Sequence, residues 1–413
     1  MKSVGGLTWQ SLVPDEKNNW LSVRSREEFE THSNIASIFS LNSNGLKTNR
    51  DTWAYNYDAQ ALSTNIASTI ETYNQEVTRW VNRRDKKTRL DEFLTTDQRK
   101  ISWSETLKAH VEAGDYASFD QAKIRLALYR PFSSQFVYFD ELLNERQYQL
   151  RSVFPTGKRG ENAVLWCKVG SDWPFFSLAT DRVPDVLPQG GSRCFPFYAY
   201  SAGGERSENI GDGALDLFRL NYGHEGITKW DVFHYLYAVL NHPEYRERYA
   251  EILRRELPHI PFVGSSTGSP EGDTDLEAFR SLVVTGKRLA EIHVHYEDQP
   301  EYPLKKIEKP GEKLDYHVEK MRLTKDKTSL VYNGFLTLSG IPLEAYEYRL
   351  GNRSALEWVI DQYQVSTDKR SGIVNDPNRD DDPEYILRLI GQVITVSLET
   401  VKLVRSLPPL GLP

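Results

Sequence analysis

The strongest pattern in the sequence lies near its end, where residues 384–406 are apolar at every third or fourth position. This spacing predicts one long amphipathic α-helix whose apolar face must be buried against a core. Arg388, Glu399 and Lys402 interrupt the apolar positions, so this helix cannot span a membrane. No apolar run of membrane-spanning length occurs elsewhere. The pattern therefore predicts a globular protein whose last helix packs on the rest of the chain.

Shorter patterns typical of helices and of strands occur throughout the chain. Helical spacing recurs over residues 63–80, 102–114, 228–241, 243–257, 275–292 and 354–363. The N-cap candidates of these helices are Ser63, Ser102, Thr228 and Ser354. Aromatic and β-branched residues predict a strand pair at 123–139 and a hairpin at 329–339. Turns are expected at Asn44-Gly45 and, with two residues, at Asn333-Gly334.

The predicted fold class is therefore α+β, with mixed sheets and hairpins in the N-terminal half and a helix-rich C-terminal half. A polar, glycine-rich segment at 201–213 predicts an exposed loop or a junction. We place a domain division there, giving a mixed α/β region at 1–205 and a helix-rich domain at 206–413.

Composition points to a reduced compartment. Cys167 and Cys194 are too few for a disulfide framework or a zinc site, and buried, reduced thiols in a cytoplasmic protein are expected. The first ten residues contain no apolar signal region, so secretion is not expected. The aromatic cluster Phe233, Tyr235, Tyr237, Tyr245 and Tyr249 is expected to be helical core.

The familiar catalytic motifs are missing from the sequence. It has no glycine-rich dinucleotide or phosphate loop, no serine nucleophile elbow and no H-E-x-x-H zinc motif. His293 and His295 could share a strand face as metal ligands, but a third ligand is not near them in sequence. These absences favour a binding protein, and no metal is expected.

Charge is unevenly distributed, although the net charge is −7. Residues 79–89 hold six basic side chains against one acid, and residues 302–327 hold eight against five. Residues 376–384, in contrast, hold five acids against one base. Such runs are often solvated faces, yet segregated charge also allows a basic, phosphate-binding surface on an acidic body.

Nine sequence blocks, taken in order, resemble one known family. The most distinctive are S-L-N-S-N-G-L-K-T-N-R-D-T-W-A-Y-N-Y at 40–57, A-L-Y-R-P-F at 127–132, T-D-R-V-P-D at 180–185, C-F-P-F-Y at 194–198, D-V-F-H-Y-L-Y-A-V-L-N-H-P-E-Y at 231–245, L-P-H-I-P-F at 257–262, Y-R-L-G-N-R-S-A-L-E-W at 348–358 and S-G-I-V-N-D-P-N at 371–378. Together they resemble the C-terminal part of the Type ISP restriction-modification enzymes. Those enzymes join nuclease, helicase-like ATPase, adenine methyltransferase and target-recognition domains in one chain.

The resemblance implies duplex DNA binding by the target-recognition part of such an enzyme. It makes residues 1–205 the region that follows the methyltransferase core and residues 206–413 the specificity domain. The methyltransferase tetrapeptide and its glycine-rich cofactor motif do not occur here. We therefore expect no catalysis by this chain alone, with S-adenosylmethionine, ATP and magnesium bound by domains absent from it. The methyltransferase core is the implied partner, in cis or as a separate subunit.

Candidate DNA-binding residues follow from the chemistry of base and phosphate recognition. Asn49 and Arg50 are suited to base edges, with Lys47 and Thr48 on phosphate, in a loop that the resemblance puts beside the methyltransferase active site. Other candidates are Arg83, Arg84, Lys86 and Lys87 as a phosphate rail, Lys158 and Arg159 in a basic loop, and Arg349 and Arg353 around a glycine turn.

Structural roles remain open for several of these residues. Arg50 could form an ion pair with Asp51, and Arg349 and Arg353 could pair with Glu357 or Asp361. Arg130 is expected to be structural. Two other functions also remain open, a divergent DNA adenine methyltransferase subunit and a ligand- or carbohydrate-binding module; the acidic balance and the many Trp and Tyr residues motivate the second.

Overall fold

A computed structural model describes residues 25–155, 162–187, 190–264, 272–311 and 313–412. Helices and short strands alternate irregularly along them. Among the described strands, pairing is antiparallel except between β4 (Ile124–Arg130) and β8 (Val183–Pro184). The architecture is α+β, which confirms the predicted fold class.

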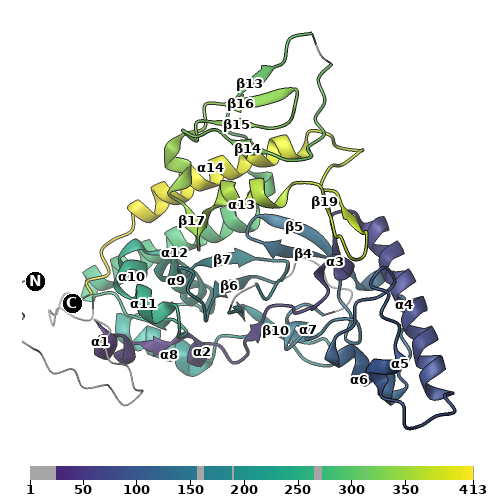
Figure 1. Ribbon diagram of the computed structural model, residues 1–413. Helices are drawn as coiled ribbons and strands as arrows, with labels where there is room; N and C mark the ends of the chain where they lie inside the picture. Colours follow the sequence, from purple (N-terminus) through teal and green to yellow (C-terminus); the bar gives the residue numbers. More distant parts are fainter. Residues whose placement is uncertain (1–24, 156–161, 188–189, 265–271, 312, 413) are drawn as a thin grey trace, which may run out of the picture.

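Two four-stranded sheets form the centre of the molecule (Figure 1). The first has the order β2-β9-β6-β7, with bounds Ser43–Asn44, Ser192–Pro196, Val164–Lys168 and Ser177–Thr180. The second has the order β3-β5-β4-β8, in which β3 is Tyr55–Asn56 and β5 is Ser133–Tyr138. The pair β4–β5 is the one predicted at 123–139. Both sheets join segments that lie far apart in the sequence.

Helices cover the first sheet on one side. They are α8 (Asp212–Tyr222), α9 (Lys229–Asn241), α10 (Pro243–Arg248), α11 (Ala250–Leu253) and α12 (Gly272–Val294). Helices α9 and α12 pack on each other and on β7. The rings of Phe233, Tyr235, Tyr237, Tyr245 and Tyr249 are fully buried, which confirms the prediction that they form core.

The predicted final helix is α14 (Tyr385–Arg405), which packs beside α13 (Ala355–Gln362). A third sheet lies on the far side of α14 from the central sheets (Figure 1). Its order is β13-β16-β15-β14, with bounds Lys305–Glu308, Leu336–Ser339, Ser329–Val331 and Arg322–Leu323.

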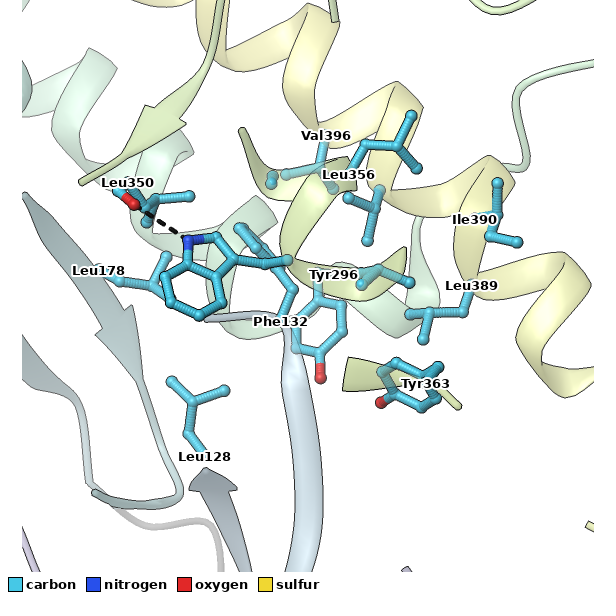
Figure 2. Close-up of a cluster of buried hydrophobic side chains, with 14 of the residues drawn as sticks. Leu128, Phe132, Leu178, Tyr296, Leu350, Leu356, Tyr363, Leu389, Ile390 and Val396 are labelled. Carbon is cyan, nitrogen blue, oxygen red and sulfur yellow. Dashed lines mark hydrogen bonds between the residues drawn. The ribbon is translucent and has the colours of Figure 1, made fainter. Parts of the chain in front are cut away.

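The apolar face of α14 meets side chains from across the chain. Figure 2 shows Leu389, Ile390 and Val396 of α14 around Leu356 of α13, with Phe132 and Leu178 farther from α14. In the same cluster the Trp358 indole donates a hydrogen bond of 3.0 Å to the Leu350 carbonyl. A buried donor needs such a partner, because an unpaired one costs roughly 1–3 kcal/mol.

A helical arm leaves the central sheets (Figure 1). It consists of α4 (Ala59–Val81), α5 (Leu90–Phe93) and α6 (Glu105–Ala113). A separate hydrophobic cluster holds it together, including Leu62, Ile66, Tyr73, Val77, Leu107 and Val111. The 23 residues of α4 correspond to a length of about 35 Å.

Short elements complete the described chain. The helices are α1 (Arg26–Thr31), α2 (Ile35–Ile38), α3 (Asp51–Ala54), α7 (Leu150–Val153) and the 3-10 turns η1 (Gln121–Lys123), η2 (Tyr296–Asp298) and η3 (Leu343–Tyr346). The two-stranded pairs are β1 (Ser33–Asn34) with β12 (His259–Ile260), β10 (Tyr198–Tyr200) with β11 (Arg206–Glu208), β17 (Arg349–Leu350) with β18 (Arg353–Ser354) and β19 (Ser366–Thr367) with β20 (Val374–Asn375).

The proposed division after residue 205 falls in the exposed loop between β10 and β11. Each of the two larger hydrophobic clusters contains side chains from both sides of this point. The two parts thus share their cores, and the division into separate domains stays a prediction.

Several predicted helix ends are correct and two are wrong. Thr228 and Ser354 cap α9 and α13, as predicted, and both sites form complete capping boxes. Helix α4 begins earlier than predicted, because Asp58 rather than Ser63 is its N-cap: the Asp58 carboxylate accepts the Ala61 N–H and brings five more residues into the helix. Helix α6 begins later, since Ser104 rather than Ser102 is its N-cap.

Two other predictions need correction. The turn between β15 and β16 has three residues rather than two, because the Asn333 side chain accepts the N–H groups of Phe335 and Leu336, both at 2.9 Å. The helix predicted at 243–257 is divided into α10 and α11 at Tyr249. Cys167 and Cys194 are buried free thiols, as predicted.

Candidate nucleic-acid interface

The loop at residues 46–53 connects the two central sheets, and close backbone packing holds it in place. Bridges join Leu46 to Asp185 and Lys47 to Arg146. Gly45 precedes the loop, and a Cβ there would lie 2.2 Å from the Asp185 carbonyl oxygen. This glycine is therefore required for close approach of two backbone segments, and the predicted turn at Asn44-Gly45 is wrong.

Asp51 is the centre of the polar contacts that brace this loop. Its carboxylate accepts hydrogen bonds from the hydroxyls of Thr48 and Tyr129, the latter at 3.1 Å. Arg130 lies 3.8 Å from the same carboxylate and 2.5 Å from that of Asp185. Burial raises the pKa of Asp185, and the guanidinium of Arg130 opposes that rise. Arg130 is thus structural, as predicted.

Arg50 points inward, with only 5% of its surface exposed. It donates to the Leu143 carbonyl at 2.6 Å and to the Ser104 hydroxyl, the N-cap of α6, at 2.5 Å. Burial lowers its pKa to about 10, so it stays charged at neutral pH. The Arg50–Asp51 ion pair, which the sequence left open as an alternative, is not present, since Asp51 pairs with Arg130 instead.

The other loop candidates differ in exposure. Thr48 is 1% exposed and its hydroxyl donates to the Asp51 carboxylate, so neither Thr48 nor Arg50 is exposed for contact with DNA. Asn49 is exposed and has a φ of 54°, in the left-handed region that Asn tolerates better than most residues. Lys47 is half-buried. The DNA-binding roles of Lys47 and Asn49 stay predictions.

Three hollows adjoin this loop and share Asp51 in their linings. The largest, of 510 Å³, lies between the loop, residues 91–108 and the β19–β20 hairpin. The others have volumes of 440 Å³ and 420 Å³ and are bordered by residues 185–187 and by the base of the same hairpin. The loop is thus the centre of one hollowed surface.

The predicted phosphate rail follows the C-terminal end of α4. Arg84, Lys86 and Lys87 are exposed, while Arg83 lies 3.3 Å above the Trp80 ring and donates to the Trp80 carbonyl. The rail follows α4 in the chain, and Asp91, four residues after Lys87, lines the 510 Å³ hollow together with Asn49.

Arg349 and Arg353 lie together in a different hollow, of 410 Å³. Arg353 forms an ion pair of 3.3 Å with Asp361, and Arg349 lies 3.9 Å from Glu357. Both arginines therefore lie beside the acids with which the sequence analysis had allowed them to pair. Lys158 and Arg159 lie outside the described residues.

The sequence analysis missed one basic element beside the loop. The tip of the β19–β20 hairpin carries Lys369 and Arg370, both exposed, and Arg370 lines the 510 Å³ hollow together with Asn49. The signal was present as D-K-R-S-G at 368–372, a turn sequence with two cations.

Metal chemistry receives no support from the part of the chain that the structure describes, where no three His, Cys, Asp or Glu side chains are grouped as ligands. His293 belongs to helix α12, is buried and bonds with Tyr237 and Thr400. Within the same residues, every helix is too short or too polar to cross a membrane.

Comparison with known proteins gives a consistent result. Residues 37–389 match the family model of the Type ISP C-terminal specificity domain. No curated protein sequence matches the chain.

Three solved structures have the same fold. The first is a nuclease-deletion mutant of the Type ISP restriction-modification enzyme LlaGI in complex with a DNA substrate mimic, with 33% identity and a TM-score of 0.83 over 99% of this chain and 37% of that chain. The second is the ATP-dependent Type ISP restriction-modification enzyme LlaBIII bound to DNA, with 30% identity and a TM-score of 0.84 over 98% of this chain and 26% of that chain. The third is a DrdV–DNA complex, with 32% identity and a TM-score of 0.83 over 98% of this chain and 41% of that chain. The present chain thus spans 26–41% of these proteins. It belongs to the family of Type ISP C-terminal specificity domains, whose role is DNA target recognition.

Proposed function

We propose that this chain binds duplex DNA sequence-specifically, as the target-recognition part of a longer restriction-modification assembly. The observation that carries the proposal is the family match over residues 37–389, together with similarity over 98–99% of this chain to proteins solved on DNA. An adenine methyltransferase core, in cis or as a separate subunit, is the proposed partner. The chemistry, and the binding of S-adenosylmethionine, ATP and magnesium, would belong to the rest of that assembly.

The hollowed surface around residues 46–53 is the proposed contact with base edges. A reader of bases must hold its side chains in fixed positions, since ordering a loop on binding costs affinity. The contacts of Asp51 with Thr48, Tyr129 and Arg130 fix this loop before DNA arrives. Asn49 is then presented outward from a braced backbone, and an Asn amide matches the N6 and N7 groups of adenine.

The exposed cations Arg84, Lys86 and Lys87 are the proposed contact with phosphate. They follow the C-terminal end of α4, and Asp91, four residues after Lys87, lines the same 510 Å³ hollow as Asn49. A duplex that contacts Asn49 at this hollow would therefore pass close to the cations as well. Phosphate contacts of this kind fix position on the duplex, while sequence is read elsewhere.

The test is a fluorescence-anisotropy titration of the full chain with randomised duplex DNA at 50 and 200 mM salt, followed by sequencing of the bound fraction. We expect binding that weakens steeply with salt and an enriched motif. In the triple variant R84A/K86A/K87A, the slope of log K against log salt should become shallower by about 0.9 for each phosphate that is no longer neutralised, with the motif unchanged. Absence of wild-type binding at 50 mM salt would refute autonomous DNA recognition by this chain.

A further inference from the structure

The β19–β20 hairpin presents a basic tip next to the 46–53 loop. The strands pair through Ser366 with Asn375 and Thr367 with Val374, and the tip follows at residues 368–373. Lys369 and Arg370 are exposed there, and the structure gives neither an ion pair among the described residues. A pair of unneutralised cations at the end of a hairpin is suited to an anionic partner.

The tip has a fixed shape. The Asp368 carboxylate accepts the backbone N–H groups of Arg370 and Ser371, at 3.1 and 2.7 Å, and the Ser371 hydroxyl at 2.9 Å. The chain then turns back through Gly372, whose φ of 76° suits glycine and whose N–H donates to the Asp368 carbonyl at 2.8 Å. Lys369 and Arg370 therefore project from a closed, internally bonded turn.

The base of the hairpin is attached to the second central sheet. The Asn56 amide donates to the Val374 carbonyl at 3.2 Å, and the Asn375 side chain accepts the Tyr57 N–H at 2.9 Å. The same Asn375 donates to Gln135 of β5 at 3.0 Å. Figure 1 shows β19 close to α3 and the start of the helical arm. The base of the hairpin is therefore held by residues 56 and 57, which closely follow the 46–53 loop in the chain.

The hollow between them is lined by both acids and bases. Its lining has equal numbers of acids and bases, namely Asp51, Asp91 and Asp368 against Arg50, Lys108 and Arg370. The acids are engaged within the protein: Asp91 pairs with Lys108 at 2.7 Å, Asp368 holds the turn and Asp51 holds the loop. Arg50 is engaged as well, because it donates to Leu143 and Ser104 and interacts with the charge of Glu145.

We propose that the β19–β20 hairpin enters a groove of duplex DNA, where Arg370 reads a base edge and Lys369 binds a phosphate. The major groove is wide enough for a two-stranded β-ribbon, and a guanidinium fork matches the O6 and N7 acceptors of guanine. Asn49 faces the same hollow, so loop and hairpin together read neighbouring base pairs. This inference rests on the proposed function and assigns it a second reading element.

The experiment compares R370A, R370K and K369A with the wild type in the full chain, using the same randomised duplex pool. The matched control is R255A, because Arg255 is an exposed arginine just after α11, on the opposite side of the molecule from β19. We expect R370A to lose selectivity at one position of the enriched motif by about tenfold or more. R370K should retain overall affinity but lose that selectivity, since an ammonium cannot form the fork.

The K369A variant should make the salt slope shallower by about 0.9 without altering the motif, as expected for one phosphate contact. R255A should match the wild type in both readouts. If the wild type selects a motif and R370A and R370K select the same motif with equal strength, the hairpin proposal is overturned while DNA recognition stands. If the wild type binds no DNA, the proposed function fails, and the hairpin proposal fails with it.

Discussion

Replacing Gly372 by alanine tests whether the shape of the hairpin tip matters for binding. At a φ of 76° an L-residue is strained, whereas a Cβ at this position would meet no atom within 4 Å. The substitution therefore changes backbone strain alone, by about 1–2 kcal/mol. Lys369 and Arg370 are left in place, so any reduction in affinity comes from the conformation of the turn.

The strain should affect binding more than global stability. The hairpin has only two residue pairs, so in the free protein G372A can relieve strain by opening the hairpin locally. DNA binding must then close it again. A cost of 1–2 kcal/mol corresponds to a Kd weakened about 5- to 30-fold, while the free energy of unfolding falls by no more than the same amount.

The assay is anisotropy with the selected duplex, alongside urea denaturation of the same samples. Gly334 offers the matched control: it lies in the β15–β16 turn, has no positive φ and equally has open space around its Cβ position. G334A should leave both quantities nearly unchanged. If G372A binds DNA within twofold of the wild type while the amide exchange of its turn increases, the closed tip is not used in binding and the reasoning is refuted.

Four further substitutions address the loop and the core. R50A should lower the free energy of unfolding in urea by about 2 kcal/mol, since it leaves the Leu143 carbonyl unpaired, and should leave the selected DNA motif intact. N49A should instead change the motif and leave the free energy of unfolding nearly unchanged. A changed motif in R50A would contradict the inward position of Arg50. Burial lowers the pKa of His293 to about 3, so the unfolded chain binds the extra proton between pH 6.5 and 3. Stability should therefore fall on acidification through this window by up to about 1.4 kcal/mol per pH unit, less steeply in H293Q; equal slopes would refute this. W358F keeps an aromatic ring but removes a buried hydrogen bond, and should lower the free energy of unfolding by about 1–3 kcal/mol in the same denaturation assay. An unchanged denaturation midpoint would contradict this.

Local signals in the sequence predicted much of the fold. The N-caps Thr228 and Ser354 and the apolar spacing of residues 384–406 depend on neighbours within one helical turn or one helix face, and these predictions are correct. Pairing of Ser43 with Cys194 or of Tyr55 with Val137 joins distant segments, and nothing local specifies it. Sheet order therefore could not be predicted from the pattern.

The candidate site shows the same limit. The sequence indicated that the loop at 47–50 carries suitable side chains, but not which of them point inward. Arg50 is buried because Leu143 and Ser104, 93 and 54 residues away, provide its acceptors. Gly45 reads as a turn residue until the Asp185 backbone is seen against it. Lys369 and Arg370 become candidates only when the hairpin is placed beside Asn49.

The attachment of the hairpin to Asn56 and Tyr57, 318 residues earlier in the chain, has a consequence for the inheritance of specificity. If both segments read DNA, the specificity of the domain is not a cassette carried by one stretch of sequence. A hybrid that takes residues 366–375 from a relative with another target, but keeps its own residues 46–57, would combine two DNA-contacting segments that recognise different target sequences. New specificities in this family would then arise by coordinated change at both places, or by exchange of the whole domain.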